Sequence, residues 1–509
     1  MKVLFVGFIS VLLSAAAGTV AGDSKTLRVG FSEDAVTLDP ANHRRRETET
    51  VIRNMYDGLL TRSMRMNVIP ELAQNWRQID EITYEFALRQ GVRFHNGDML
   101  TADDIKFTFE RLSREGGMEG ETSPRKTLLP EIESISVLDD FTVRFNLLSP
   151  WPQLPAMLPL QEVVSRRFVE SNRAAGLDEI ANGTGPFRLV EWTKGERIVM
   201  RRFEDYYGGA PQMPPVGPAC VEQLEFQIIP DAGKRVASLL KGDVNIIDKL
   251  PASAVDEVDA HAGTKVMQVP GTRTYFVALN MNRPPLNELA VRRAMNHAID
   301  RDRLIEHFFV GGARTVNGVL SPYAFGYNPD LPAYEYDPRK SRRLLEAAGF
   351  RQSRPMVFHA DQNFQSLAFA MAEMLAEVGI EIDVVIDTSQ AIRERWLSGK
   401  ETGDMWLTSW GNGSLDPVGI FNPTLRSGGR GNFNGYANRE VDALLHQAMI
   451  ETSQTKRARL FQSAEKLVNR DAPWLFLWVP EALYGVSTDL RGWRPSSDGR
   501  INLHDACVD

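Results

Sequence analysis

The segment from residue 356 to residue 410 constrains the fold most strongly, because apolar strand patterns alternate there with helical ones. Three strands are predicted, at residues 356–360, 380–386 and 405–410. Two helices are predicted between them, at residues 367–378 and 392–397. This strand–helix–strand–helix–strand order predicts a parallel sheet with right-handed crossovers.

Two polar segments follow these strands and are candidate ligand contacts, because ligands bind such sheets beyond the carboxyl ends of the strands. The first spans residues 361–365. The second, residues 411–417, has the sequence GNGSLDP, and its glycines let the backbone approach a partner closely. An ordinary strand-to-helix connection is the alternative. A polar stretch at 426–432 extends this region, and long polar loops are usually functional or mobile.

The rest of the chain also alternates strands with helices. Apolar alternation predicts strands around residues 27–31, 82–88 and 141–147. Thr101 and Asn287 are each placed to cap a helix. Asp337 and Pro338 predict the start of another helix, and Gly349 predicts its end. A chain of 509 residues, 43% of them hydrophobic, can form two or three α/β domains.

Charge and motif content exclude several functions. The formal net charge of −8 argues against a general nucleic-acid binder, because neutralising phosphates needs a basic face. The chain has two cysteines and eight histidines without C-x-x-C or H-E-x-x-H, so neither a metal site nor a cofactor is predicted. The G-x-S-x-G and P-loop motifs are absent, but catalytic triads are spatial, so an enzyme stays open as an alternative.

Residues 1–22 have the pattern of a secretory signal peptide. Lys2 gives the positive start, residues 3–17 are apolar, and residues 19–21 resemble a cleavage site. The apolar run is shorter than the ~20 residues of a membrane-spanning helix, which disfavours a single N-terminal anchor. No cysteine ends the run, so we expect an exported, soluble protein without a lipid anchor.

Export would place Cys220 and Cys507 in an oxidising compartment. A disulfide between them would tie the end of the chain to its body, and two exported cysteines have only each other as partners. So long a closed loop would contribute about 4–5 kcal/mol in the loop-entropy treatment. Two separate buried thiols are the alternative.

Residues 44–46 are three consecutive arginines that follow the first predicted strand and the turn at 38–40. Arginine holds carboxylates in bidentate pairs, and loops after strands face the ligand side of a sheet. Arg44 and Arg45 are therefore candidate anion-binding residues. A solvated basic stretch is the alternative.

In sequence, nearly the whole chain after residue 22 resembles one family: the extracytoplasmic solute-binding proteins of ABC importers for dipeptides, oligopeptides, nickel and opine-like solutes. Each matching motif is short, but the ordered set is specific. The motifs are TLDP at 37–40, NMYDGLL at 54–60, PELA at 70–73, LRQGVRFHNG at 88–97, LTADDIKF at 100–107, GTGPF at 183–187, DYYG at 205–208, VRRA at 291–294, AIDR at 298–301, YDP at 336–338 and LLEAAG at 344–349.

The resemblance implies an α/β fold with two lobes around a ligand cleft, and with an extra subdomain in the first lobe. This is the type II, cluster C periplasmic binding protein fold. The implied first lobe comprises residues 23–62, 184–272 and 483–509, the inserted subdomain residues 63–183, and the second lobe residues 273–482. The hinge is expected near residues 272–275 and near Pro480.

The implied function is capture of a peptide-like or related small solute by hinge closure, followed by delivery to an ABC permease in the inner membrane. We then expect a periplasmic monomer that is not an enzyme and binds no nucleic acid. A secreted hydrolase using the same cleft is the first alternative. A periplasmic sensor without a transport role is the second, and the sequence does not separate sensing from transport.

The ligand anchors of peptide-binding relatives are missing from their expected positions. In those relatives an Asp commonly lies three residues after the Trp that corresponds to Trp410 and pairs with the peptide amino group; Gly413 stands there. Gln362 replaces the Arg that binds the peptide carboxylate, and Phe364 replaces the usual Tyr. We therefore expect a modified peptide, an opine, a metal chelate or another acidic solute rather than a plain dipeptide. A peptide held mainly through its backbone is the alternative.

Two of the candidate ligand contacts have rival structural roles. Trp410 either stacks on the ligand or belongs to the core, and Asp416 is also placed to cap the next helix. The candidate ligand-binding residues are Arg44, Arg45, Tyr275, Gln362, Phe364, Trp410, Asn412, Ser414 and Asp416.

Overall fold

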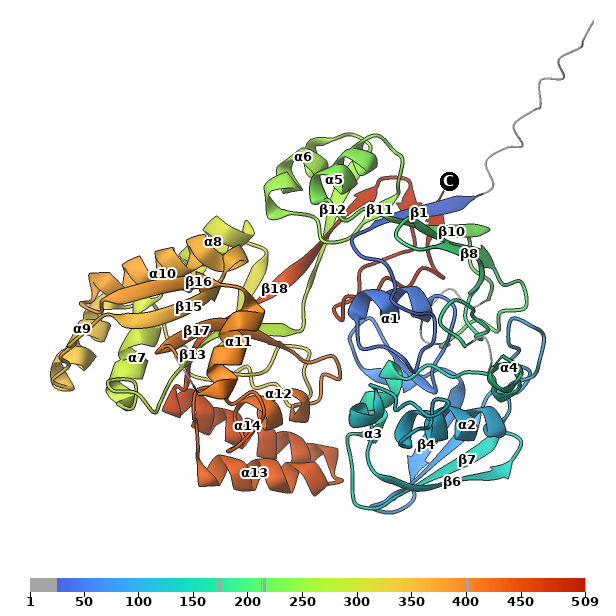
Figure 1. Cartoon of the computed structure of the whole chain (residues 1–509), viewed down its shortest axis with the longest axis horizontal. Coiled ribbons are helices and arrows are strands. Elements are labelled where there is room, and N and C mark those ends of the chain that lie inside the picture. The colour runs from blue at the N-terminus through green and yellow to red at the C-terminus, as the bar shows by residue number, and fades with distance from the viewer. Residues whose placement is uncertain (1–24, 173–175, 212, 214–216, 400–401, 509) are drawn as a thin grey trace, which may run out of the picture.

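The computed structural model describes residues 25–172, 176–211, 213, 217–399 and 402–508, and the expected signal peptide lies outside them. Figure 1 shows two lobes joined by long strands that pass from one to the other. A single mixed sheet of twelve strands runs through both lobes. The chain is therefore an α/β protein with two lobes, as the resemblance implies.

The first lobe contains one half of this sheet. Its strands lie in the order β11 (Ile246–Ile247), β1 (Thr26–Phe31), β10 (Gln223–Ile228), β9 (Arg197–Arg202) and β8 (Phe187–Thr193). β1 is parallel to β10 and β11, whereas β9 is antiparallel to β10. The helices of this half are α1 (Arg46–Arg53), α5 (Ala232–Leu240) and α6 (Val255–Ala260).

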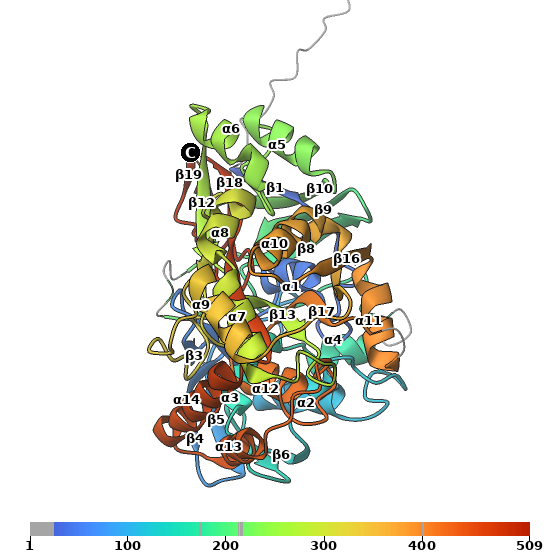
Figure 2. The same cartoon turned by 90° about the vertical axis from the view of Figure 1, so that its left-hand side faces the viewer.

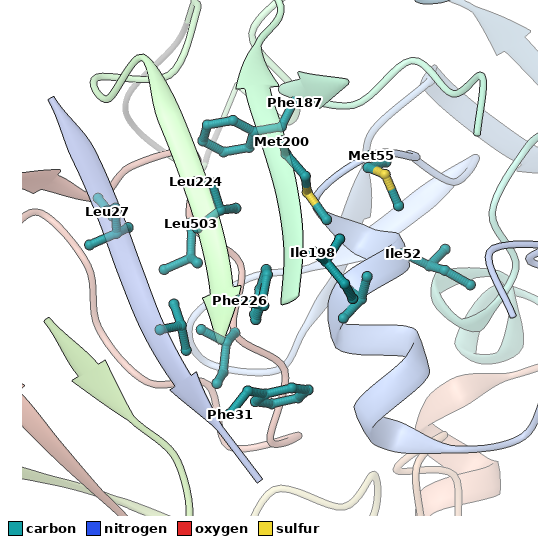
Figure 3. Close-up of a cluster of buried hydrophobic side chains, with 14 of the residues drawn as sticks. Leu27, Phe31, Ile52, Met55, Phe187, Ile198, Met200, Leu224, Phe226 and Leu503 are labelled. Carbon is teal, nitrogen blue, oxygen red and sulfur yellow. The ribbon is translucent and has the colours of Figure 1, made fainter. Parts of the chain in front are cut away.

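The core of the first lobe follows from the alternation in β1 (Figure 3). Leu27 and Phe31 point to the same side, and Phe31 meets Phe226 edge to face with ring centroids 5.4 Å apart. Ile52 of α1 and Leu503 near the end of the chain belong to the same cluster. The C-terminal segment is therefore part of the first lobe's core.

A separate antiparallel sheet follows β2 (Leu60–Arg62) and β3 (Val68–Pro70). Its strands lie in the order β4 (Ala73–Gln78), β5 (Thr83–Leu88), β7 (Thr142–Leu147) and β6 (Ile132–Asp139). Helix α2 (Ala102–Ser113) packs on it through Phe109, which lies 5.0 Å from the ring of Phe145. Thr101 caps α2 in a capping box, as predicted. Two short helices complete this part, α3 (Leu154–Met157) and α4 (Arg166–Ser171).

The second lobe confirms the parallel sheet predicted from residues 356–410. Its strands lie in the order β16 (Ile382–Asp387), β15 (Met356–Asp361), β17 (Met405–Gly411), β13 (Arg273–Leu279) and β18 (Trp474–Ser487). β15 is parallel to both β16 and β17. The crossover helices are α10 (Gln365–Glu377) and α11 (Ser389–Ser398).

Both faces of this sheet are covered, which explains the continuous apolar sequence of β13. Val277 packs on one face with α7 (Leu289–Ala298), α8 (Arg301–Phe309), α9 (Pro338–Ala347) and α10. Phe276 packs on the other with α12 (Val418–Thr424), α13 (Arg439–Ile450) and α14 (Gln454–Asp471). Figure 2 faces this lobe and shows α7 and α9 on one side, with α11 on the other.

Two predicted helix starts had different outcomes. Asp337 caps α9 by accepting the N–H of Lys340 at 2.8 Å, and Gly349 follows the helix with a left-handed backbone, as predicted. The prediction that Asn287 caps the next helix is wrong, because α7 begins after Glu288. Arg292 binds the carbonyls of Leu286 and Asn287, at 2.8 and 3.0 Å, and so fixes this segment through its own side chain.

The chain passes between the lobes along neighbouring strands. Residues 474–478 of β18 pair with β13 in the second lobe, and residues 481–487 pair with β12 (Thr264–Pro270) in the first. The short β14 (Ala313–Thr315) also pairs with β18. Between these regions the N–H of Gly271 donates to the carbonyl of Pro480 at 3.0 Å.

Cys220 and Cys507 form a disulfide in the first lobe, with Cα atoms 5.3 Å apart. Cys507 belongs to β20 (Cys507–Val508), which pairs with β19 (Leu490–Arg491). The bond joins residues separated by 287 positions and fastens the end of the chain to the strand region before β10.

Candidate ligand-binding site

A cavity of about 1340 Å³ lies between the lobes. The first lobe and the region of the separate antiparallel sheet contribute residues from the segments 44–49, 125–129 and 151–160 to its lining. The second lobe contributes Arg273, the end of β17, the loop after it and Arg430. We call this cavity the cleft. Its volume exceeds the ~300–1,000 Å³ of common small-ligand pockets, so it can enclose a peptide-sized solute.

Charged side chains dominate the cleft. Its lining contains six arginines and two glutamates, which are Arg44, Arg45, Arg46, Arg125, Arg273, Arg430, Glu47 and Glu49. The positive charges therefore outnumber the negative ones, although the chain as a whole is acidic. Such a local excess attracts anionic solutes.

The deep wall of the cleft is a buried network whose charges are mutually paired. Glu49 accepts a hydrogen bond from Arg500 at 2.7 Å and another from Arg46 at 2.9 Å. Burial by itself would raise the pKa of Glu49, but Arg500, Arg46 and Arg125 hold it below its ordinary value. Arg125 also pairs with Glu162 at 3.1 Å. This network needs no ligand to satisfy its charges.

The arginine run divides into paired and unpaired members. Arg45 lies 3.5 Å from Glu33, and Arg46 is held by Glu49. Arg44 instead donates to the hydroxyl of Thr127 at 2.8 Å and forms no ion pair among the described residues. Of the three, Arg44 has charge left for a ligand.

Two arginines of the second lobe are also without a carboxylate in the described part of the chain. Arg273 donates to the hydroxyl of Ser409 at 3.2 Å, and the guanidinium of Arg430 lies 4.9 Å above the Trp410 ring. Burial lowers the pKa of Arg44, and the positive charges of Arg430 and Arg125 lower it further. The positive charges of Arg44 and Arg430, which come from opposite lobes, therefore repel each other across the cleft. An anion between them would relieve this repulsion.

The loop after β17 is held mainly by its own hydrogen bonds. Asn412 donates to the carbonyl of Asp416 at 2.9 Å, and Ser414 donates to the side-chain oxygen of Asn412 at 3.0 Å. The indole N–H of Trp410 donates to the carbonyl of Gly419 at 2.9 Å. These three side chains line the cleft, but their polar groups form hydrogen bonds within residues 410–419. Among the described residues the hydroxyl of Ser414 forms no hydrogen bond with a His, Asp or Glu side chain.

Gly413 lies where the first lobe approaches this loop. A Cβ atom added at Gly413 would lie 3.1 Å from Nη2 of Arg46. A guanidinium therefore lies beside the position of Gly413. A free amino group placed here would meet a like charge.

Four predicted site residues lie outside the lining of the cleft. Tyr275 is half-buried and packs against the ring of Phe364, with centroids 5.6 Å apart. Gln362 is exposed at the start of a short turn before α10. Asp416 is buried and accepts two hydrogen bonds from Arg457, at 2.6 and 2.8 Å, as well as the N–H of Val418. Of its two predicted roles, Asp416 therefore has the structural one in the described residues.

Arg273 and Arg125 were not singled out by the sequence, and Arg430 was noted only as part of a polar segment. Arg273 begins a strand, and Arg430 lies in a loop more than 150 positions away. Only the fold brings both to the edge of the cleft that faces Arg44. Arg430 could have been suggested from the sequence, because it lies between two glycines in the polar stretch at 426–432.

Fold and site together define a two-lobed solute-binding protein with its ligand cleft between the lobes. The profile of the bacterial extracellular solute-binding proteins, family 5 (middle region), matches residues 67–432. The chain belongs to this family. In the described residues no helix is long and apolar enough to cross a membrane.

The names of individual relatives mention different ligands. The chain is 29% identical to the probable di/tripeptide-binding protein 5 of Pseudomonas aeruginosa, over 87% of each protein. It is 27% identical to heme-binding protein A of Haemophilus influenzae, over 87% of this chain and 84% of that protein. The solved structure of HbpA2 from Haemophilus parasuis is similar with a TM-score of 0.85 and 23% identity, covering 95% of this chain and 100% of that one.

Proposed function

We propose that this chain is the periplasmic substrate-binding component of an ABC importer and that it captures an acidic, peptide-related solute for delivery to a membrane permease. Family membership supports the binding role. The names of its relatives, among them di/tripeptide-binding and glutathione-binding proteins, support a peptide-related ligand. It acts as a monomer in this account and makes or breaks no bond.

The observation that carries the acidic ligand is the set of unpaired arginines, Arg44, Arg273 and Arg430. They come from both lobes and line one cleft, and none is matched by a carboxylate among the described residues. A carboxylate between them would accept charge-assisted hydrogen bonds, which are roughly twice as strong as neutral ones. A modified peptide, an opine or a conjugate with a free acid has this chemistry.

The surroundings of Gly413 support the exclusion of plain dipeptides. The nearby guanidinium of Arg46 has no acceptor to offer the free amino group that such a ligand carries. The exposed Gln362, away from the cleft lining, supplies no substitute for the carboxylate-binding Arg of peptide-binding relatives. An acid bound by Arg44, Arg273 and Arg430 needs neither anchor.

We propose that capture proceeds by closure about two interlobe connections, near residues 272–275 and Pro480. The switch of partners within β18 and the contact of Gly271 with Pro480 support this position. A ligand that contacts both lobes favours the closed state by its differential affinity. The proposed lobes are residues 23–62, 184–272 and 483–509 with an insertion at 63–183, and residues 273–482.

A thermal-shift screen tests the proposal. Residues 23–509 are unfolded and refolded to remove bound solute, then melted with dipeptides, acidic tripeptides, glutathione, opines, oligosaccharides and nickel chelates. A ligand at about 100 times its dissociation constant adds roughly 2.7 kcal/mol of stability. We expect acidic peptides, glutathione or opines to raise the melting temperature most. Stabilisation by neutral dipeptides but not by their acidic analogues would overturn the acidic ligand.

A further inference from the structure

We propose that the cleft has a second compartment, which receives an uncharged apolar or aromatic group of the same ligand. This inference rests on the proposed function, because it extends the ligand beyond the acid bound by Arg44, Arg273 and Arg430. The proposed ligand is therefore amphipathic, with an acidic group in the cleft and an apolar group next to it.

A cavity of about 320 Å³ adjoins the cleft, and the two share Ser414 in their linings. We call it the side compartment. One wall comes from β2, the turn after it, β3, β4 and α3, with Met66, Trp76 and Pro155. The other comes from the second lobe, with Tyr323 and Phe325. Its volume suits a single aromatic group, and its aromatic walls offer stacking or edge-to-face contacts.

The charged side chains that line the side compartment bind mainly to other groups of the protein. Arg457 and Asp416 are at most 2% exposed and form a bidentate pair with contacts of 2.6 and 2.8 Å. Arg62 donates to the carbonyls of Met66 and Ala156, each at 2.9 Å, and to that of Ser414. Among these three residues only the buried Nε of Arg62 is without a hydrogen-bond partner, so a charged ligand group would find few partners here and its burial would be costly. An uncharged group fits.

The bond from Arg62 to Ser414 links the lobes at the boundary between the two cavities. Arg62 belongs to β2 of the first lobe's region, whereas Ser414 belongs to the loop after β17. Both walls of the side compartment are in place only when the lobes approach each other. An apolar group bound there therefore adds to the differential affinity that favours closure.

Matched tripeptides test the side compartment by isothermal titration calorimetry on residues 23–509. The probes are Asp-Ala-Phe and Phe-Ala-Asp, each compared with the same peptide carrying Ala in place of Phe. We expect at least one Phe peptide to bind ten times more tightly than its Ala counterpart. Equal affinities in both pairs would overturn the inference, and so would no binding by any of the four peptides.

A filling variant provides the second readout. Gln454 is the exposed first residue of α14 and lines the side compartment, so Gln454→Trp should place an indole in it. Thr455→Trp puts the same side chain on the next exposed position, outside the lining. We expect the ratio of Phe to Ala affinities to fall towards one in Gln454→Trp and to persist in Thr455→Trp. A ratio that persists in both variants would overturn the inference.

The two proposals can fail separately. If the Phe preference is abolished by Gln454→Trp, but replacing Asp by Asn in the peptides leaves affinity unchanged, the acidic ligand is rejected and the side compartment is supported. If Asp matters and Phe does not, the acidic ligand is supported and the side compartment is rejected.

Discussion

Arg44, Arg273 and Arg430 differ from the other arginines of the cleft in one respect: their charges are not cancelled by a neighbouring carboxylate in the described chain. Arg46 and Arg125 belong instead to the network around Glu49 and stabilise the first lobe. The sequence pointed to Arg44 and Arg45 within the run at 44–46, because arginine runs after a strand favour anion binding. It could not separate Arg44 from Arg45, since the difference depends on which carboxylates the fold brings near.

Replacing Arg430 by Ala should weaken binding of an acidic ligand about tenfold, which corresponds to 1.4 kcal/mol. The reason is the loss of one charge-assisted contact from the second lobe. The matched control is Arg426→Ala, which removes an exposed arginine of the same segment outside the cleft lining. Calorimetric dissociation constants should change only for Arg430→Ala. Similar losses in both variants would indicate a general effect of charge instead.

Gly413→Asp should convert the contact with Arg46 into an ion pair between the lobes. A carboxylate at this position would lie beside Nη2 of Arg46 and would repel an acidic ligand. We expect a higher melting temperature without ligand and at least tenfold weaker binding of the acid. Gly413→Asn has nearly the same shape without the charge and serves as the control. Matching behaviour of the Asp and Asn variants would rule out the electrostatic explanation.

At the scale of elements, the features that depend on neighbouring residues were predicted from the sequence, and those that depend on distant contacts were not. Strands β15, β16 and β17 were predicted because their apolar runs and crossover helices are local features. Asp337 was also predicted as a cap, since its acceptor geometry depends only on the next three residues. The start of α7 was not, because Arg292 fixes it. Arg273 and Arg430 depend on how distant segments meet, which no local pattern records.

Asp416 anchors this loop to α14, and Asp416→Ala should be strongly destabilising. It would leave Arg457, whose side chain is 1% exposed, without its partner. Breaking a buried pair in this way typically costs about 3–5 kcal/mol. Urea unfolding should show a loss of that size, compared with about 1 kcal/mol or less for Asp387→Ala, whose partner Arg395 is partly exposed. Equal losses in the two variants would contradict the anchoring role.

At the scale of the whole molecule, one sheet connects the lobes and the C-terminal segment returns to the first lobe. The family resemblance anticipated this two-lobed arrangement, which composition and periodicity alone could not. The disulfide and Leu503 hold the returning segment against the sheet that contains β1. The cleft therefore lies between two separately built cores, and this is the arrangement that hinge closure requires.

Replacing Cys220 and Cys507 together by Ser should lower the free energy of unfolding by about 2–5 kcal/mol, because a closed loop spanning 287 positions restricts the unfolded chain. Neither residue lines the cleft, so ligand affinity should stay unchanged. Urea unfolding and calorimetry measure the two quantities. Unaltered stability would contradict the stabilising role of the disulfide. A large loss of affinity would contradict its independence from the ligand site.

The most direct test of the account compares one acid with its uncharged analogue. The strongest acidic hit from the thermal-shift screen and the same molecule with its carboxylate converted to an amide are titrated into the refolded wild-type protein. If unpaired arginines from both lobes hold the ligand, the acid should bind at least ten times more tightly, and the difference should shrink as salt rises. Equal binding, or tighter binding of the amide, would contradict the account.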